Sequence, residues 1–183
     1  MYLCPNKTHL QSTKNFKIMD YKIIDIEGVG DVYAEKLTAA GINKVSELLE
    51  KCADPKGRKA LADATEISEK LILRWTNHAD LFRINGVGPQ FSELLEKAGV
   101  DTVKEFRHRV AENLQPKLEE INAQYNICGR VPSIAEVQKM IDQAKELEPK
   151  MTYEINKESR QLAGFFINYY VTFHVEFACA RMS

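Results

Sequence analysis

The chain has 183 residues, of which 44% are hydrophobic and 28% are charged, and its formal net charge is −1. These values are ordinary for a globular protein of one domain or of two small ones, and they exclude a global basic field that would attract nucleic acid. The four cysteines lie far apart in the sequence and form no CxxC pair, so we expect free thiols and no metal site.

The first 18 residues form a polar tail with no signal-peptide core and no regular period. The most apolar stretch, residues 165–180, spans only 16 residues and contains Asn168, His174 and Glu176. It is therefore too short and too polar to cross a membrane. We expect a cytoplasmic protein that makes no membrane contact.

Regular patterning begins at residue 19. A helix is predicted from Gly30 to about Ala40, with Gly41 ending it and Asn43 as the N-cap of the next helix. A loop at residues 54–57 leads to a short helix over residues 58–64. Apolar residues at spacings of three and four then predict a long amphipathic helix. They are Ile67, Leu71, Trp75, Ala79 and Phe82.

The second half of the chain repeats this plan. Gly99 ends one helix, Asp101 starts another, and residues 114–125 form a third. Ser133 and Glu136 form a capping box at the start of a last helix, which Pro149 stops. We predict that residues 19–153 form an all-α domain of two related halves that share one hydrophobic core.

The last segment, residues 154–183, is an aromatic-rich extension with a different pattern. Its apolar residues alternate with mostly polar neighbours, which predicts a lone β-strand. They are Ile167, Tyr169, Val171, Phe173, Val175 and Phe177.

One five-residue segment occurs twice in the chain. Residues 26–30 read Ile-Glu-Gly-Val-Gly, and residues 84–88, 58 positions later, read Ile-Asn-Gly-Val-Gly. The similarity continues downstream, because ten of the 22 positions in residues 26–47 and 84–105 are identical. A Gly-apolar-Gly turn that opens a helix leaves backbone N–H groups that can hold an anion.

Three interpretations of these turns compete. A Rossmann dinucleotide turn needs a small residue three positions after the second glycine, where this chain has Tyr33 and Phe91, so it is disfavoured. A helix-hairpin-helix has a small residue four positions after that glycine, matched here by Ala34 and Ser92. Its second glycine lets a phosphate approach the helix N-terminus. In the third interpretation the turns only join packed helices.

The second turn is the better candidate for a phosphate site, because Asp25, Glu27 and Asp31 surround the first and would repel an anion. Its expected nucleic-acid contacts are Arg83, Asn85, Gly86, Val87 and Gly88. The weaker candidates are Gly28, Gly30, Lys56, Arg58, Lys59, Arg107 and Arg109.

Several segments resemble a known family. They are residues 19–30, residues 55–59 (Pro-Lys-Gly-Arg-Lys), residues 67–75 and residues 81–88. Over about residues 19–153 the chain resembles the family catalogued as domain of unknown function 4332. The resemblance implies a small bacterial-type cytosolic protein with paired helix-hairpin-helix elements, and it implies no activity.

No grouping of nucleophile, base and acid is apparent, so we expect no enzyme. The leading hypothesis is a binding module that makes weak, sequence-independent contact with double-stranded DNA through the second hairpin. It needs no cofactor, although a monovalent cation could sit at a hairpin turn. The alternative is a protein-interaction or scaffold module whose hairpins are purely structural. Residues 19–153 hold 19 basic and 23 acidic residues, and this net charge of −4 is opposite in sign to that of most nucleic-acid binders.

Overall fold

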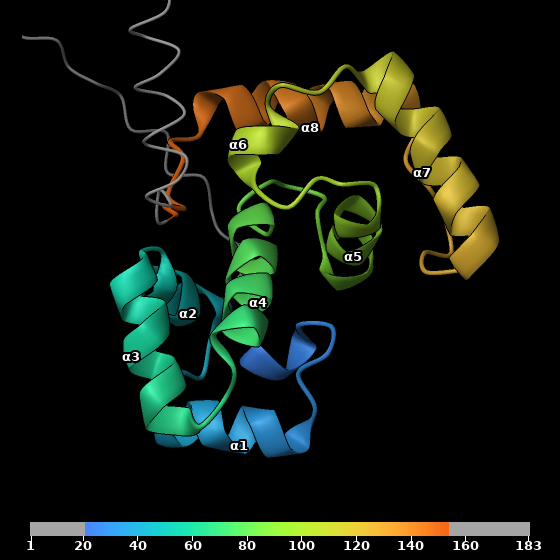
Figure 1. The fold of residues 1–183 in the computed structure, drawn as a ribbon. Helices are drawn as coiled ribbons and strands as arrows, with labels where there is room; N and C mark the ends of the chain where they lie inside the picture. The colour runs from blue at the N-terminus through green and yellow to red at the C-terminus, as the bar shows by residue number, and fades with distance from the viewer. Residues whose placement is uncertain (1–20, 154–183) are drawn as a thin grey trace, which may run out of the picture. The chain divides into compact units, whose positions relative to one another are not determined.

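A computed structural model of the chain describes residues 21–153, and these residues are helical with no strand among them (Figure 1). A 3₁₀ turn, η1 (Ile23–Asp25), precedes the α-helices. The helices are α1 (Asp31–Ala39), α2 (Val45–Cys52), α3 (Pro55–Thr65), α4 (Glu69–Leu81), α5 (Pro89–Lys97), α6 (Val103–Phe106), α7 (Ala111–Tyr125) and α8 (Ile134–Glu146). The all-α prediction is confirmed for this part of the chain.

The contacts within the chain divide it after Met151, so the description below concerns residues 21–151. The predicted polar tail and the predicted C-terminal strand lie outside the described residues. The domain bounds drawn from the sequence stay predictions.

The sequence repeat is also a repeat of hydrogen bonds. In the first turn the N–H of Val29 donates to the carbonyl of Ile26 at 3.0 Å. In the second turn the N–H of Val87 donates to the carbonyl of Ile84 at 3.1 Å. The middle glycines have φ angles of +86° at Gly28 and +92° at Gly86, a region that side chains with a Cβ rarely adopt.

The helices that follow the two turns also end alike. Gly41 and Gly99 have φ angles of +76° and +78°, and each lies just past a helix C-terminus. The next residue returns a hydrogen bond to the helix: Ile42 donates to Leu37 and Val100 donates to Leu95, both at 2.9 Å. Glycine at these positions terminates the helix without the steric cost of a Cβ.

Two helix starts differ from the prediction by one residue. The N-caps are Lys44 and Thr102 rather than Asn43 and Asp101. The carboxylate of Glu47 accepts hydrogen bonds from the N–H groups of both Asn43 and Lys44, at 2.7 and 3.1 Å. The side chain of Glu47 therefore caps the start of α2 in place of the predicted Asn43 side chain. The predicted Ser133 capping box is confirmed.

The predicted loop at residues 54–57 is instead the first turn of α3. Pro55 occupies the first helical position, where its fixed φ suits a helix and its lack of an N–H costs nothing. The Asp54 carboxylate accepts the N–H of Gly57 at 2.6 Å and caps the helix. Turn-forming residue types therefore mark a helix start here.

A single cluster of buried apolar residues extends through both halves, as predicted. Helix α4 packs against α2 and α3 on one side and against α5 on the other (Figure 1). It carries the fully buried Trp75 and Ile72, and Phe82 follows at its end. Because α4 closes the first half and leads into the second turn, neither half has a complete core without it.

The two glycines of the first turn should differ in their tolerance of a side chain. Gly28→Ala should lower the free energy of unfolding by about 1–2 kcal/mol, because alanine is strained at φ +86°. Gly30→Ala is the matched control, since Gly30 has a φ of −81° and an added Cβ there meets no atom within 4 Å. Urea unfolding measures the stability of both variants. Equal losses would contradict the conclusion that position 28 needs glycine for its positive φ angle.

Candidate functional site

The second hairpin joins α4 to α5 through residues 82–88. Gly88 is the N-cap of α5, with φ −114° and ψ −174°, and Pro89 is the first helical residue. Within residues 21–153 the backbone N–H groups of Gly88 and Gln90 donate to no other group. Such N–H groups at a helix N-terminus can donate hydrogen bonds to an anion.

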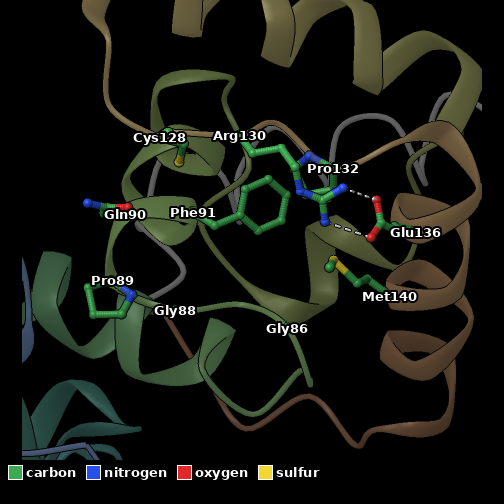
Figure 2. A pocket seen from close by; sticks show the side chains of 11 residues that line it. Gly86, Gly88, Pro89, Gln90, Phe91, Cys128, Arg130, Pro132, Glu136 and Met140 are labelled. Atoms are coloured by element: carbon green, nitrogen blue, oxygen red, sulfur yellow. Dashed lines mark hydrogen bonds and ion pairs between the residues drawn. The ribbon is translucent and has the colours of Figure 1, made fainter.

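Helix α8 lies directly against this hairpin. The side-chain oxygen of Gln143 accepts the N–H of Asn85 at 3.0 Å. A Cβ added to Gly86 would come within 2.8 Å of Met140 Cε. Figure 2 shows Met140 reaching from α8 toward Gly86. The N–H of Asn85 is therefore bound by α8, and Met140 lies close to Gly86.

A cavity of about 620 Å³ opens between the start of α5, the α7–α8 loop and α8 (Figure 2). Phe91, Pro132 and Met140 supply apolar walls, and Arg130 and Glu136 supply charge. The Arg130 guanidinium donates to both Glu136 oxygens, at 3.1 and 2.8 Å. Hydrogen bonds from Arg130 and from Ser133 lower the pKa of Glu136 to about 2. The positive charge of Arg130 in the cavity is therefore compensated by the carboxylate of Glu136.

Arg83, the predicted principal phosphate contact, points into the protein. Its side chain is 6% exposed and donates through Nη1 to Oδ1 of Asp80 at 2.7 Å. Its Nη2 donates to the carbonyl of Glu148 at 2.9 Å. Asp80 is 1% exposed, and its second oxygen accepts the N–H of Val103 at 3.0 Å. Both ends of the guanidinium are therefore used inside the fold.

The other arginines named from the sequence also have internal acceptors. Arg58 is buried and donates to the carbonyls of Cys52 and Ala53, which closes the end of α2. Arg107 donates to the carbonyl of Lys145, and Arg109 donates to that of Gly99. The structure does not gather these side chains into one basic surface.

Lys56 and Lys59 of α3 are exposed, and no partner is recorded for either among residues 21–153. They lie on a helix that packs against α2 and α4. They are therefore open to a ligand but belong to a different part of the fold from the second hairpin.

The first hairpin has an open surface instead. Gly28 and Gly30 are exposed, and so are Asp25, Glu27 and Asp31. The carboxylate of Asp25 accepts the N–H of Lys22 at 2.9 Å and lies at the surface. The negative charge predicted around this turn is thus present in the structure.

One polar cluster was not foreseen from the sequence. Arg74 donates to both oxygens of Glu96, at 2.8 and 3.0 Å, and His78 Nε2 lies 3.0 Å from Glu96 Oε2. Burial alone would raise the pKa of Glu96, but the hydrogen bonds from His78 and Arg74 outweigh it and lower the pKa to about 2. Arg74 and His78 are four residues apart, so helical spacing could have placed them on one face.

In the described residues no group of three potential metal ligands is present. Cys52 and Cys128 are buried free thiols, and burial raises the pKa of Cys52 to about 11. This suits a packing role better than a reactive one. No helix between residues 21 and 153 is long and apolar enough to cross a membrane. The absence of enzymatic activity and a monovalent cation at a turn stay predictions.

The comparison with known families covers most of the helical region. The model of the family described as Domain of unknown function (DUF4332) matches residues 27–147. The chain belongs to this family. No curated protein and no solved structure matches it significantly. The matched range includes both glycine turns and the eight α-helices of residues 21–153.

The buried ion pair should matter far more to stability than the exposed one. Arg83→Met should lower the free energy of unfolding by about 3–5 kcal/mol, because it leaves the Asp80 carboxylate buried without its charge partner. Arg130→Met is the control, since Arg130 is 73% exposed and its loss leaves Glu136 in water. Similar losses in urea unfolding would show that Arg83 is not structural.

Glu96 should contribute a pH-dependent part of the stability. Its pKa of about 2 lies below the usual 4.5, so its stabilisation is complete above about pH 4.5 and is lost as the pH falls toward 2. Urea unfolding of Glu96→Gln should therefore show a shallower loss of stability between these pH values than the parent. A Glu96→Gln profile parallel to that of the parent would contradict the role of this cluster.

Proposed function

We propose that this chain is a non-enzymatic protein-interaction module whose glycine hairpins are structural elements of its core. The observation that carries the proposal is the burial of Arg83 against Asp80. A guanidinium held at 2.7 Å by a buried carboxylate cannot also serve as the main contact to a phosphate. The residue that most favoured DNA binding in the sequence thus supports the structural interpretation.

The surface charge supports the same conclusion. Phosphate-backbone binding depends on several open lysines and arginines, because each neutralised phosphate releases counterions. Here Arg58, Arg83, Arg107 and Arg109 donate to groups of the protein itself. The acidic surface around Gly28 would repel a duplex.

Weak DNA binding is the second candidate, and one observation favours it. The N–H groups of Gly88 and Gln90 have no acceptor among residues 21–153, and Gly88 is half-buried while Gln90 is exposed. A phosphate could meet both at the positive end of α5. Such contacts would carry no sequence information.

A titration of fluorescein-labelled duplex DNA separates the two candidates. We expect no binding at about 50 mM salt, where backbone contacts are strongest. Gln90→Glu places a negative charge at the open end of α5, and Gln124→Glu makes the same change on the exposed part of α7. Binding that weakens with salt, disappears in Gln90→Glu and survives in Gln124→Glu would overturn the proposal in favour of DNA.

A further inference from the structure

The repeat provides an internal comparison between two equivalent helices. Helix α5 buries Phe91, Ser92, Leu94 and Leu95, and α7 packs against it. Helix α1, its counterpart in the first half, buries only Leu37, and its main helix contact is with the short η1. The equivalent residues of α1, Tyr33, Ala34 and Lys36, are only half-buried, so this helix is less covered in the first half than in the second.

We propose that the first hairpin and the outer face of α1 form a docking surface for a basic segment of another protein that carries an apolar anchor. This inference rests on the proposed protein-interaction function and names the chemistry of the partner. It follows from exposed apolar side chains and from a ring of carboxylates on the same surface.

The apolar part of this surface consists of Ile24 and Val32. Ile24 is 44% exposed and Val32 is 67% exposed, although both are large aliphatic residues. The position equivalent to Val32 in the second half holds the polar Gln90. A groove of about 630 Å³ lies beside Ile24. Its walls are Ile24, Asp31, Ala34, Glu35, Thr38 and Ala39.

The charged part determines which partner fits. Asp25, Glu27, Asp31 and Glu35 are all exposed around this groove and turn. Lys36, the one basic residue of α1, is held 3.5 Å from Glu66. Charge complementarity therefore favours lysine and arginine beside the anchor and disfavours an acidic or phosphorylated partner.

The indole of Trp75 lies beneath the first turn. Its indole Nε1 is buried and has no hydrogen-bond partner in the described residues. It lies 3.6 Å from the position that a Cβ on Gly28 would occupy, and its ring packs against Tyr33 with centroids 5.2 Å apart. This donor has no exposed surface, so Trp75 supports the turn from inside and is not part of the docking surface.

The probe for the test is a fluorescein-labelled amphipathic peptide of leucine and lysine, with a leucine–glutamate peptide of the same pattern as its counterpart. Only the lysine peptide should bind the full chain. In ¹H–¹⁵N spectra it should shift the amide signals of Gly28, Gly30 and Val32. The equivalent signals of Gly86, Gly88 and Gln90 should stay in place.

Charge reversal gives the matched comparison. Glu27→Lys/Glu35→Lys should weaken binding of the lysine peptide about tenfold or more. Asp63→Lys/Glu120→Lys changes the net charge equally at exposed sites on α3 and α7, and it should leave the affinity unchanged. Val32→Gln copies the residue of the second half, and it should weaken binding without any change of charge.

Three outcomes would overturn the inference: equal losses in the two charge-reversal variants, amide shifts that map to another surface, or dimers in sedimentation that Val32→Gln dissociates. The last would assign this face to a second copy of the chain. None of these results depends on the DNA titration, so the docking surface can fail while the protein-interaction function stands. Salt-sensitive DNA binding lost in Gln90→Glu would instead remove the proposed function itself.

Discussion

The arrangement of the second half depends on the hydrogen bonds of one buried carboxylate, that of Asp80. One oxygen holds Arg83, and the other accepts the N–H of Val103 at the start of α6. Arg83 in turn donates to the carbonyl of Glu148, beyond α8. One charged group at the end of α4 thereby connects three segments that are far apart in the sequence. Burying it is favourable only because its charge and its hydrogen-bonding capacity are both satisfied.

The first half connects the corresponding segments without a buried charge. Val45 is the residue equivalent to Val103, and its N–H donates to the backbone carbonyl of Tyr21 at 3.0 Å. At the positions that correspond to Asp80 and Arg83, the first half has Lys22 and Asp25. The charges are exchanged and lie at the surface. The two halves share a backbone plan, but their polar chemistry has diverged.

This divergence explains why the two hairpins offer different surfaces. In the second half, the α7–α8 loop and α8 line a cavity at the start of α5, and Met140 lies close to the turn at Gly86. In the first half α1 keeps an open face with aliphatic side chains and carboxylates. A hairpin that α8 contacts, next to an arginine paired with Asp80, is suited to a structural role. An open hairpin with complementary charge is suited to binding a protein.

Sequence patterns were sufficient to predict the all-α class, the repeat, the helix ends at Gly41 and Gly99, and the Ser133 cap, because each depends on backbone preferences within a few residues. The helix start at Pro55 was missed, because the same residue types form turns and open helices. The direction of the Arg83 side chain could not be predicted from such local preferences. Its partners are Asp80, one turn back, and a carbonyl 65 residues ahead, and only the packing of α4 against the second half brings them together. Whether a charged side chain meets water or a buried carboxylate depends on which surfaces are covered, and that is a property of tertiary structure.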